Sequence, residues 1–387
     1  MKIAVMNYGG KSANRGGSIG YLNNLYSSTD SAKQLPDFLF VENFQAPNNS
    51  KNLSKNTEPK NKMIMCLRDF AYFLALGVRC KKKLGKIVNE YDIIHVHCSQ
   101  DAFYLKYFCL YKGHIILTSH RPEPYLEEGR PILCESKGMI YRLLKKFYIY
   151  MEKKSYEIAD GFIFPSPGAK EIYNKFPGFL EGSKGKPIEY VYTGINKKEV
   201  TISREDYRKK YDIPLDKFVV TFIGRHIGIK GYDRLVDIYP KLKENNIEVV
   251  VAGAESNLQH PNDVGWKELG YIDDAQNLMN ASDIVVIPNR NTYYDLVVVE
   301  ALSAGSIVIS SNTGGNIDIA EKTDGLILFD NTNEQSFLDK ILCVQSMDEN
   351  EIIRRKESAL DFYNEYGNNK KFVDNYVKAI EKLCKSL

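Results

Sequence analysis

Few of the residues that mark special protein classes occur in this chain of 387 residues, which has one Trp, six His and seven Cys. The cysteines are scattered, odd in number and without a C-x-x-C pair. This pattern disfavours a disulfide framework or a zinc site and favours reduced thiols. The longest apolar run, from Phe70 to Val78, is far shorter than the ~20 residues that span a bilayer. The first residues suit a strand better than a signal peptide, so we expect a cytoplasmic protein.

The net charge is also close to zero, at +3, but the charges are unevenly distributed. Residues 1–199 contain 30 Lys and Arg against 19 Asp and Glu, whereas residues 200–387 contain 22 against 30. A basic half joined to an acidic half indicates two domains that face different partners. The length also suits two domains, and a hydrophobic fraction of 43% can fill two cores.

Short apolar runs alternate with helical patterns along the chain, which is typical of a parallel sheet with crossover helices. Residues 196–215 separate two such series and carry the change of charge. We therefore predict an α/β protein with two doubly wound Rossmann-like domains, residues 1–198 and 199–361, that face a central cleft. A final helix over residues 362–387 can pack back on the first domain, and residues 44–61 are interpreted as a mobile loop. The predicted strands are residues 3–7, 38–42, 93–97, 115–118, 161–165, 188–192, 218–223, 248–252, 283–287, 307–311 and 326–328.

The loop over residues 14–20 follows the first strand and precedes a helix. Its glycines, Gly16 and Gly17 among them, let the backbone approach a ligand, and the N–H groups of the helix start favour an anion. The loop lacks the dinucleotide pattern G-x-G-x-x-G. Phosphate contact and a tight turn without a ligand both remain open.

A second loop, residues 224–231, places Arg225 and Lys230 on either side of a glycine turn, directly after a buried strand. Arg offers a bidentate fork and Lys a point charge, and this pair suits a diphosphate. A solvated basic loop is the alternative.

A third segment, residues 291–305, predicts a helix that begins near Asp295 and is capped at Gly305. The first N–H groups of this helix would form an anion site where the strand over residues 283–287 ends. Glu300 lies on this mostly apolar helix, and a buried carboxylate there needs a hydroxyl pair or a cation. An exposed or ion-paired Glu300 is the alternative.

The order of these motifs resembles the retaining GT-B-fold glycosyltransferases of the large family four (glycosyl transferases group 1), of the bacterial surface-polysaccharide type. The resemblance covers nearly the whole chain. Its landmarks are the Gly16-Gly17 loop, residues 92–97, 117–120, 159–166 and 194–196, Gly224-Arg225 with Lys230-Gly231, and residues 281–288 and 314–318.

The resemblance implies that a sugar is transferred from a nucleoside-diphosphate donor, UDP being favoured, with retention at the anomeric carbon and without a metal. The acceptor would be a glycan or a lipid-linked saccharide in the synthesis of a bacterial cell-surface polysaccharide such as a capsule. No cofactor is expected besides the nucleotide sugar itself, which is a co-substrate.

The resemblance also implies roles for single residues. Arg225 and Lys230 would stabilise the leaving diphosphate, His120 would lie beside the donor sugar, and Glu300 would hold the ribose hydroxyls. The implied catalytic residues are Arg225, Lys230, His120 and Asp295, and the implied donor-binding residues are Gly16, Gly17, Thr292, Tyr294, Leu296, Val297, Glu300 and Tyr271.

One departure concerns the helix motif of the family, which usually has a first Glu, in contact with the donor sugar, eight residues before the second. That position is Thr292 in this chain, and the glycine that usually follows the aromatic residue is replaced by Asp295 after Tyr294. Either Asp295 supplies the missing carboxylate, or the sugar is contacted differently, as a deoxy or furanose sugar would be.

Two other classes of protein remain as alternatives. A catalytically silent GT-B-fold subunit that binds glycan or supports an active partner would explain Thr292, although the intact Arg225, Lys230 and Glu300 disfavour it. A sugar-nucleotide epimerase of related fold fits the sequence less well, because its acid–base carboxylates are not apparent.

Nucleic-acid binding is not expected, since the basic half lacks a known module. His95 and His97 lack a partner at ligand spacing, so core packing is favoured over metal binding.

Two basic amphipathic segments, Lys62–Lys86 and Arg142–Lys154, lie in the first half of the chain. Such helices can rest on an anionic leaflet, where each cation near the surface adds ~1 kcal/mol. Packed helices with solvated lysines are the alternative. Peripheral contact with the inner face of the plasma membrane, at a lipid-linked acceptor, is therefore a hypothesis beside a purely cytoplasmic location.

Overall fold

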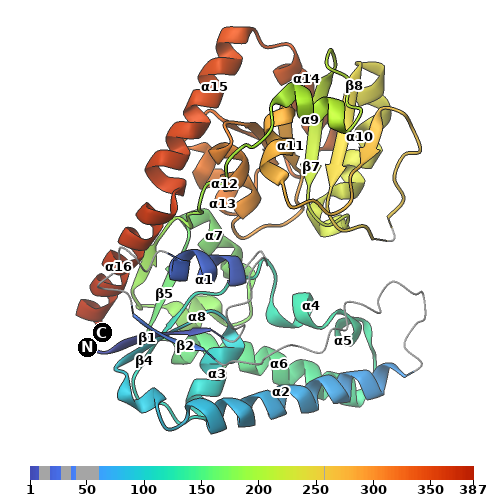
Figure 1. Cartoon of the computed structure of the whole chain (residues 1–387). Coiled ribbons are helices and arrows are strands. Elements are labelled where there is room, and N and C mark those ends of the chain that lie inside the picture. Colours follow the sequence, from blue (N-terminus) through green and yellow to red (C-terminus); the bar gives the residue numbers. More distant parts are fainter. Residues whose placement is uncertain (8–17, 28–35, 41–60, 257) are drawn as a thin grey trace. The chain divides into compact units, whose positions relative to one another are not determined.

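A computed structural model describes residues 1–7, 18–27, 36–40, 61–256 and 258–387 of the chain. The chain divides into two compact units, which we call unit 1 (Met1–Val191 with Val373–Leu387) and unit 2 (Tyr192–Phe372). In each unit the described strands form a six-stranded sheet in which all neighbours are parallel, and helices cover both faces (Figure 1).

Unit 1 has the strand order β2-β1-β3-β4-β5-β6. Its strands are β1 (Ile3–Asn7), β2 (Asp37–Phe40), β3 (Ile93–Val96), β4 (His114–Leu117), β5 (Gly161–Phe164) and β6 (Ile188–Tyr190). Its helices include α1 (Ser18–Ser27), α2 (Lys62–Leu84), α3 (Ser99–Tyr107), α4 (Tyr125–Gly129), α5 (Pro131–Glu135), α6 (Met139–Ile158), α7 (Pro167–Glu171), α8 (Phe179–Ser183) and most of α16 (Asn369–Ser386). Strands β3 and β5 are buried throughout, as expected for a parallel sheet covered on both faces.

Unit 2 has the strand order β12-β11-β10-β7-β8-β9. Its strands are β7 (Phe218–Ile223), β8 (Ile247–Ala252), β9 (Trp266–Glu268), β10 (Ile284–Ile287), β11 (Ile307–Ser311) and β12 (Leu326–Phe329). Its helices are α9 (Arg204–Lys210), α10 (Tyr232–Glu244), α11 (Ala275–Ala281), α12 (Leu296–Ser303), α13 (Gly315–Ala320), α14 (Glu334–Gln345) and α15 (Glu349–Phe362) in the described part of the unit.

The core of unit 2 follows the two-residue period of its strands. Val220 and Val286 pack in the cluster that contains the buried residues of α10 and α14. Their neighbours Val219 and Val285 pack in the clusters that contain residues of α9, α11 and α12. Successive side chains of a strand point to opposite faces, so an apolar run of this kind fills two layers of core at once.

The winding of each sheet reverses at one strand, and ligands of open α/β sheets bind at the carboxyl ends of the strands at such a reversal. In unit 2 the chain runs outward from β7 to β8 and β9, and then returns to place β10 on the other side of β7. In unit 1 the reversal lies between β1 and β3. The loops that follow β7 and β10 are therefore the first place to look for a ligand site in unit 2.

Every predicted strand is present, with its described ends within two residues of the prediction. The strand β9 was missed, because its three residues include Lys267 and Glu268 and form no apolar run. Trp266 packs in the core of unit 2. The loop predicted over residues 44–61 lies outside the described residues, except Asn61, whose side chain caps the start of α2.

The predicted C-terminal helix is present as α16, but it begins seven residues later than the predicted start at residue 362. Helix α15 ends at Phe362, a π-helical turn occupies Tyr363–Gly367, and α16 begins at Asn369. Asn368 has extended backbone angles and forms a β-bridge with Ile195, which interrupts the helix. The units divide after Val191 and after Phe372, whereas the sequence placed the divisions after residues 198 and 361.

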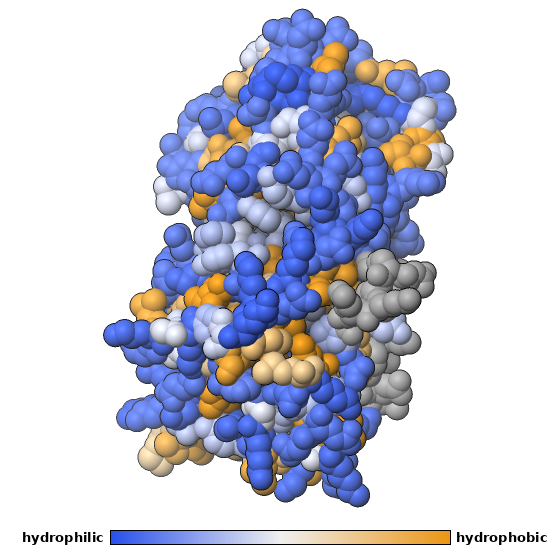
Figure 2. Space-filling view, turned by 90° about the vertical axis from the view of Figure 1, so that its left-hand side faces the viewer, coloured by the Kyte–Doolittle hydropathy of each residue, from blue (hydrophilic) through white to orange (hydrophobic). Residues whose placement is uncertain are grey.

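Hydrophilic side chains cover most of the face seen in Figure 2, and hydrophobic ones lie between them. Among the helices that the structure describes, none has both the length and the apolar character needed to cross a bilayer.

Candidate functional site

The loop after β7 presents two cations at the reversal point of unit 2. The side chain of Arg225 is exposed, and its guanidinium makes no hydrogen bond or ion pair with the described residues. Lys230 ends a 3₁₀ turn over Gly228–Lys230. Gly231 follows with φ of 68°, and a Cβ there would lie 1.9 Å from the carbonyl oxygen of Pro288. Only glycine fits, so this glycine fixes the turn that carries Lys230.

The same turn is fastened to the loop after β10 by Arg290. One Nη of Arg290 donates to the carbonyl oxygen of Gly228 and to a carboxylate oxygen of Asp233, both at 2.6 Å. The backbone N–H of Arg290 donates to the carbonyl oxygen of Ile229 at 3.0 Å. The two loops at the reversal point therefore form one connected structure.

Helix α12 begins in this structure, with Asp295 as its N-cap residue. The ammonium of Lys230 lies 3.1 Å from Oδ1 of Asp295, and the Asn289 amide donates to Oδ2 at 2.6 Å. The predicted helix is confirmed, since α12 starts after Asp295 and Gly305 follows it with φ of 72°. The contact between Lys230 and Asp295 was not predicted, because 65 residues separate them in the sequence.

Glu300 lies on α12 with its side chain partly exposed. Burial raises the pKa of its carboxyl group, and Lys198 acts in the opposite direction. Among the described residues, none forms a hydrogen bond or ion pair with this carboxylate. Its oxygens are therefore available to a ligand with paired hydroxyl groups.

The other predicted donor-binding residues differ in their exposure. Thr292 is buried, and burial raises the pKa of Tyr294 well above its usual value. Leu296 and Val297 form the first turn of α12, where backbone N–H groups lack partners within the helix. The side chain of Tyr271 is 73% exposed. Gly16 and Gly17 lie outside the described residues.

His120 belongs to unit 1, after the end of β4, in a row of three imidazoles. Nδ1 of His97 lies 3.0 Å from Nε2 of His120, and the two rings are stacked. His95 lies beside His97 and is bonded on both nitrogens, to Tyr376 and Thr118 at 2.8 Å each. Burial lowers the pKa of His95 and of His120 to about 3, so the rings are neutral at pH 7. His95 and His97 are buried in the core, as predicted.

A metal site would need several ligands together. In the described ranges, no three or more His, Cys, Asp and Glu side chains are arranged to hold a metal ion.

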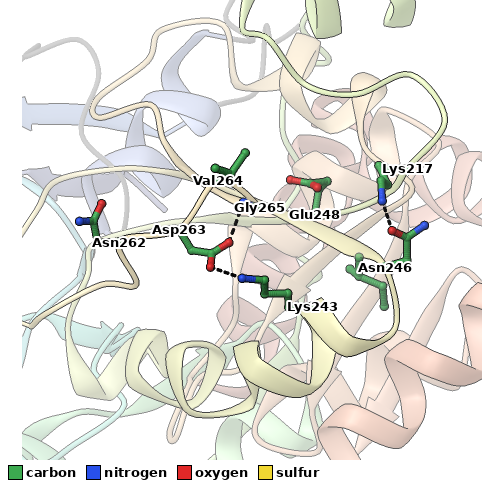
Figure 3. Close-up of a pocket in the computed structure, with 9 residues that line it drawn as sticks. Lys217, Lys243, Asn246, Glu248, Asn262, Asp263, Val264 and Gly265 are labelled. Carbon is green, nitrogen blue, oxygen red and sulfur yellow. Dashed lines mark hydrogen bonds and ion pairs between the residues drawn. The ribbon is translucent and has the colours of Figure 1, made fainter.

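A hollow of about 440 Å³ lies at the other end of the unit 2 sheet, where β7, β8 and β9 begin (Figure 3). Both lysines and Asp263 already have partners, because Lys243 pairs with Asp263 and Lys217 donates to the amide oxygen of Asn246. Because these groups already have partners, the hollow is a weaker candidate than the loops that carry Arg225 and Lys230.

Sequence models of two families match this chain. Glycosyltransferase Family 4 matches residues 41–199, and Glycosyl transferases group 1 matches residues 217–346. An uncharacterized glycosyltransferase from Methanocaldococcus jannaschii is 26% identical over 260 residues, and the match spans 62% of each chain, which is less than two thirds of that relative. An uncharacterized 41.2 kDa protein in the cps region of Klebsiella pneumoniae is 23% identical over 303 residues, 75% of this chain and 78% of that protein.

Among solved structures, Anabaena HepE in complex with UDP-glucose matches the whole of both chains. The TM-score is 0.66 and the sequence identity is 16%, so this likeness concerns the fold.

Proposed function

Because this chain belongs to the GT-B-fold glycosyltransferases of family 4 (glycosyl transferases group 1), we propose that it transfers a sugar from a nucleoside-diphosphate donor with retention at the anomeric carbon. One observation carries the proposal. Arg225, Lys230 and the start of α12 lie together at the carboxyl ends of β7 and β10, the reversal point of the unit 2 sheet. Two cations and a helix N-terminus suit the diphosphate of such a donor.

In this proposal the leaving diphosphate is stabilised by donors already aimed at the place where its charge develops. Arg225 and Lys230 supply positive charge, and the first turn of α12, at Leu296 and Val297, supplies backbone N–H groups. With these groups in place, transfer needs no metal ion. Gly16 and Gly17 are proposed to add further N–H groups.

The other parts of the donor, which are the ribose, the base and the sugar, are assigned to the remaining predicted residues. Glu300 is proposed to accept hydrogen bonds from the ribose hydroxyls, which would satisfy a carboxylate that has no partner among the described residues. Tyr271 is proposed to lie beside the base and His120 beside the transferred sugar, with Thr292 and Tyr294 contributing to the donor site. We propose UDP as the nucleotide, and the UDP-glucose complex of HepE supports this choice.

A thermal-shift panel of UDP, GDP, dTDP and ADP tests the donor site. One nucleotide should raise the melting temperature of the wild-type protein, and Lys230→Ala should lose that shift, because binding to the folded state stabilises it. Lys243→Ala is the matched control, since Lys243 is a lysine of unit 2 at the opposite end of the sheet. No shift with any of the nucleotides would overturn the donor site and favour the catalytically silent subunit.

The acceptor is proposed to be a glycan or a lipid-linked saccharide of a bacterial surface polysaccharide. The similarity to the Klebsiella protein in the cps region supports this part of the proposal. A lipid-linked acceptor would be reached at the anionic inner face of the plasma membrane.

The exposed side chains of two helices in unit 1 are evidence in favour of a surface that contacts the membrane. Helix α2 exposes Ile64, Leu67, Leu74 and Val78 along one side, at 62%, 43%, 39% and 46%. Helix α6 exposes Met139 and Leu143, and the two helices pack together through the rings of Phe70 and Phe147. Basic residues accompany these side chains, among them Arg68, Arg79, Lys82, Lys83, Arg142 and Lys146. Exposed apolar side chains among cations are typical of surfaces that rest on anionic lipids.

Sedimentation with vesicles tests this surface. The protein should sediment with phosphatidylglycerol vesicles at low salt, less at high salt, and little with phosphatidylcholine vesicles. The double substitution Leu67→Glu and Leu74→Glu should reduce sedimentation, whereas Leu215→Glu, at an exposed leucine of unit 2, should have a much smaller effect. No sedimentation with phosphatidylglycerol at low salt would overturn the membrane part of the proposal.

A further inference from the structure

Asp295 is an unusual N-cap residue. It precedes α12 with extended backbone angles, φ of −88° and ψ of 108°, and only 6% of the residue is exposed. An N-cap Asp ordinarily accepts a hydrogen bond from an N–H in the first turn of its own helix. Asp295 makes no such bond. Its carboxylate is therefore directed to other groups.

Two buried amides hold one oxygen of this carboxylate. Asn289, which is 1% exposed, donates to Oδ2 at 2.6 Å, and Asn316, which is fully buried, donates to the same oxygen at 3.4 Å. Asn316 is itself fixed by a 2.7 Å hydrogen bond to the hydroxyl of Ser310, at the end of β11. A buried carboxylate needs such donors, and here they come from the loop after β10 and from α13.

The other oxygen, Oδ1, lies 3.1 Å from the ammonium of Lys230. A lysine side chain has four rotatable bonds, and holding it in one place costs conformational entropy. An ammonium has three N–H donors, so one bond to Asp295 leaves two for an anion. The side chain of Lys230 is 32% exposed, which leaves its end accessible to a ligand.

We propose that Asp295 is a positioning residue, which holds the ammonium of Lys230 at the first turn of α12 and does not contact the transferred sugar. The proposal rests on the proposed function, in which Lys230 binds the donor diphosphate. It replaces the hypothesis that Asp295 substitutes for the family's first Glu. Both carboxylate oxygens are engaged within unit 2, on a residue that is almost fully buried.

Binding measurements on the full-length chain test this role. The affinities for UDP, uridine and UDP-glucose are compared in the wild type, Asp295→Ala, Lys230→Ala and the double variant, with GDP, guanosine and GDP-mannose used instead if only GDP binds. Asp295→Ala should weaken UDP binding about tenfold, as expected when a charge-assisted hydrogen bond is lost. Uridine binding should not change, because uridine lacks the diphosphate.

The double variant should bind UDP no more weakly than Lys230→Ala, because both substitutions remove the same interaction. The ratio of UDP-glucose to UDP affinity should stay constant in all variants. Asp295→Asn keeps the shape of the side chain and is measured alongside, so the role can still be tested if Asp295→Ala does not fold. It should weaken UDP binding as well, by a smaller factor.

Three results would overturn the positioning role. Unchanged UDP affinity with a lower affinity ratio for UDP-glucose would show that Asp295 contacts the sugar. A parallel loss of uridine and UDP binding would show a structural role only, and independent effects in the double variant would separate Asp295 from Lys230. If the wild type binds no nucleoside diphosphate, the proposed function fails and this inference fails with it.

Discussion

The row of buried histidines in unit 1 should make the protein sensitive to acid. His95 and His97 are 0% and 5% exposed, and burial lowers the pKa of both, to about 3 for His95 and well below its usual value for His97. In the unfolded chain a histidine has a pKa near 6.5. Between these values the unfolded state binds protons that the folded state does not, so stability falls as the pH drops below about 6.5.

The size of the effect follows from proton linkage. At pH 5 His95, with its pKa of about 3, lowers the free energy of unfolding by about 2 kcal/mol, and His97 lowers it further. For a unit of this size the contribution of His95 alone corresponds to a fall of roughly 5 °C in melting temperature between pH 7.5 and pH 5. Other ionisable groups add their own dependence, so the informative quantity is the difference between the wild type and a variant.

The assay is thermal unfolding by circular dichroism from pH 5 to pH 8, with hydrogen exchange of peptides from β3 and β4 to follow unit 1. His97→Gln should lose less stability than the wild type between pH 7.5 and pH 5. His260→Gln changes an exposed histidine and is the control, which should lose as much stability at pH 5 as the wild type does. Equal pH dependence in the wild type and His97→Gln would refute the reasoning, because His97 would then not be held neutral by burial.

Three substitutions in unit 2 give further tests. Gly231→Ala should lower the free energy of unfolding by about 1–3 kcal/mol in denaturant titration. The residue has φ of 68°, and an alanine Cβ there would clash with the carbonyl oxygen of Pro288. Unchanged stability would mean that the turn can relax. Glu300→Gln should raise the donor KM with kcat little changed, and an unchanged KM would reject the ribose role. Arg208→Met should cost about 3–5 kcal/mol of stability, because Arg208 is 1% exposed and its removal leaves several carbonyl oxygens without their side-chain donor, whereas Asp283 keeps Arg204. A loss below about 1 kcal/mol by the same titration would contradict this.

The architecture could be predicted because parallel strands covered on both faces are near-continuous apolar runs, and β10 is an unbroken one. The ends of α12 could also be predicted from local sequence, because Asp295 precedes the helix and Gly305 follows it. The short β9 carries no such signal. The break at Asn368 depends on its bridge to Ile195, a contact between residues far apart in the chain.

The candidate site was predicted only in part. Local sequence gave the cations Arg225 and Lys230 beside a glycine turn and a helix start near Asp295. It could not show that Lys230 and Asp295 meet, because that contact depends on β7 and β10 being neighbours in the sheet. Nor could it show that His95 bonds to Tyr376, which lies 281 residues further along the chain.

The central claim is that this chain transfers a sugar from a nucleoside diphosphate whose charge is stabilised by Lys230. Proton NMR of nucleotide-sugar consumption, with a lipid-linked or glycan acceptor present, tests it most directly. The account predicts that an α-linked donor gives an α-linked product and free nucleoside diphosphate. Lys230→Ala should slow this reaction at least a hundredfold, because one donor to the developing charge contributes ~3 kcal/mol to the stability of the transition state. Lys243→Ala should not slow it. A β-linked product, or equal rates in the wild type and Lys230→Ala, would contradict it.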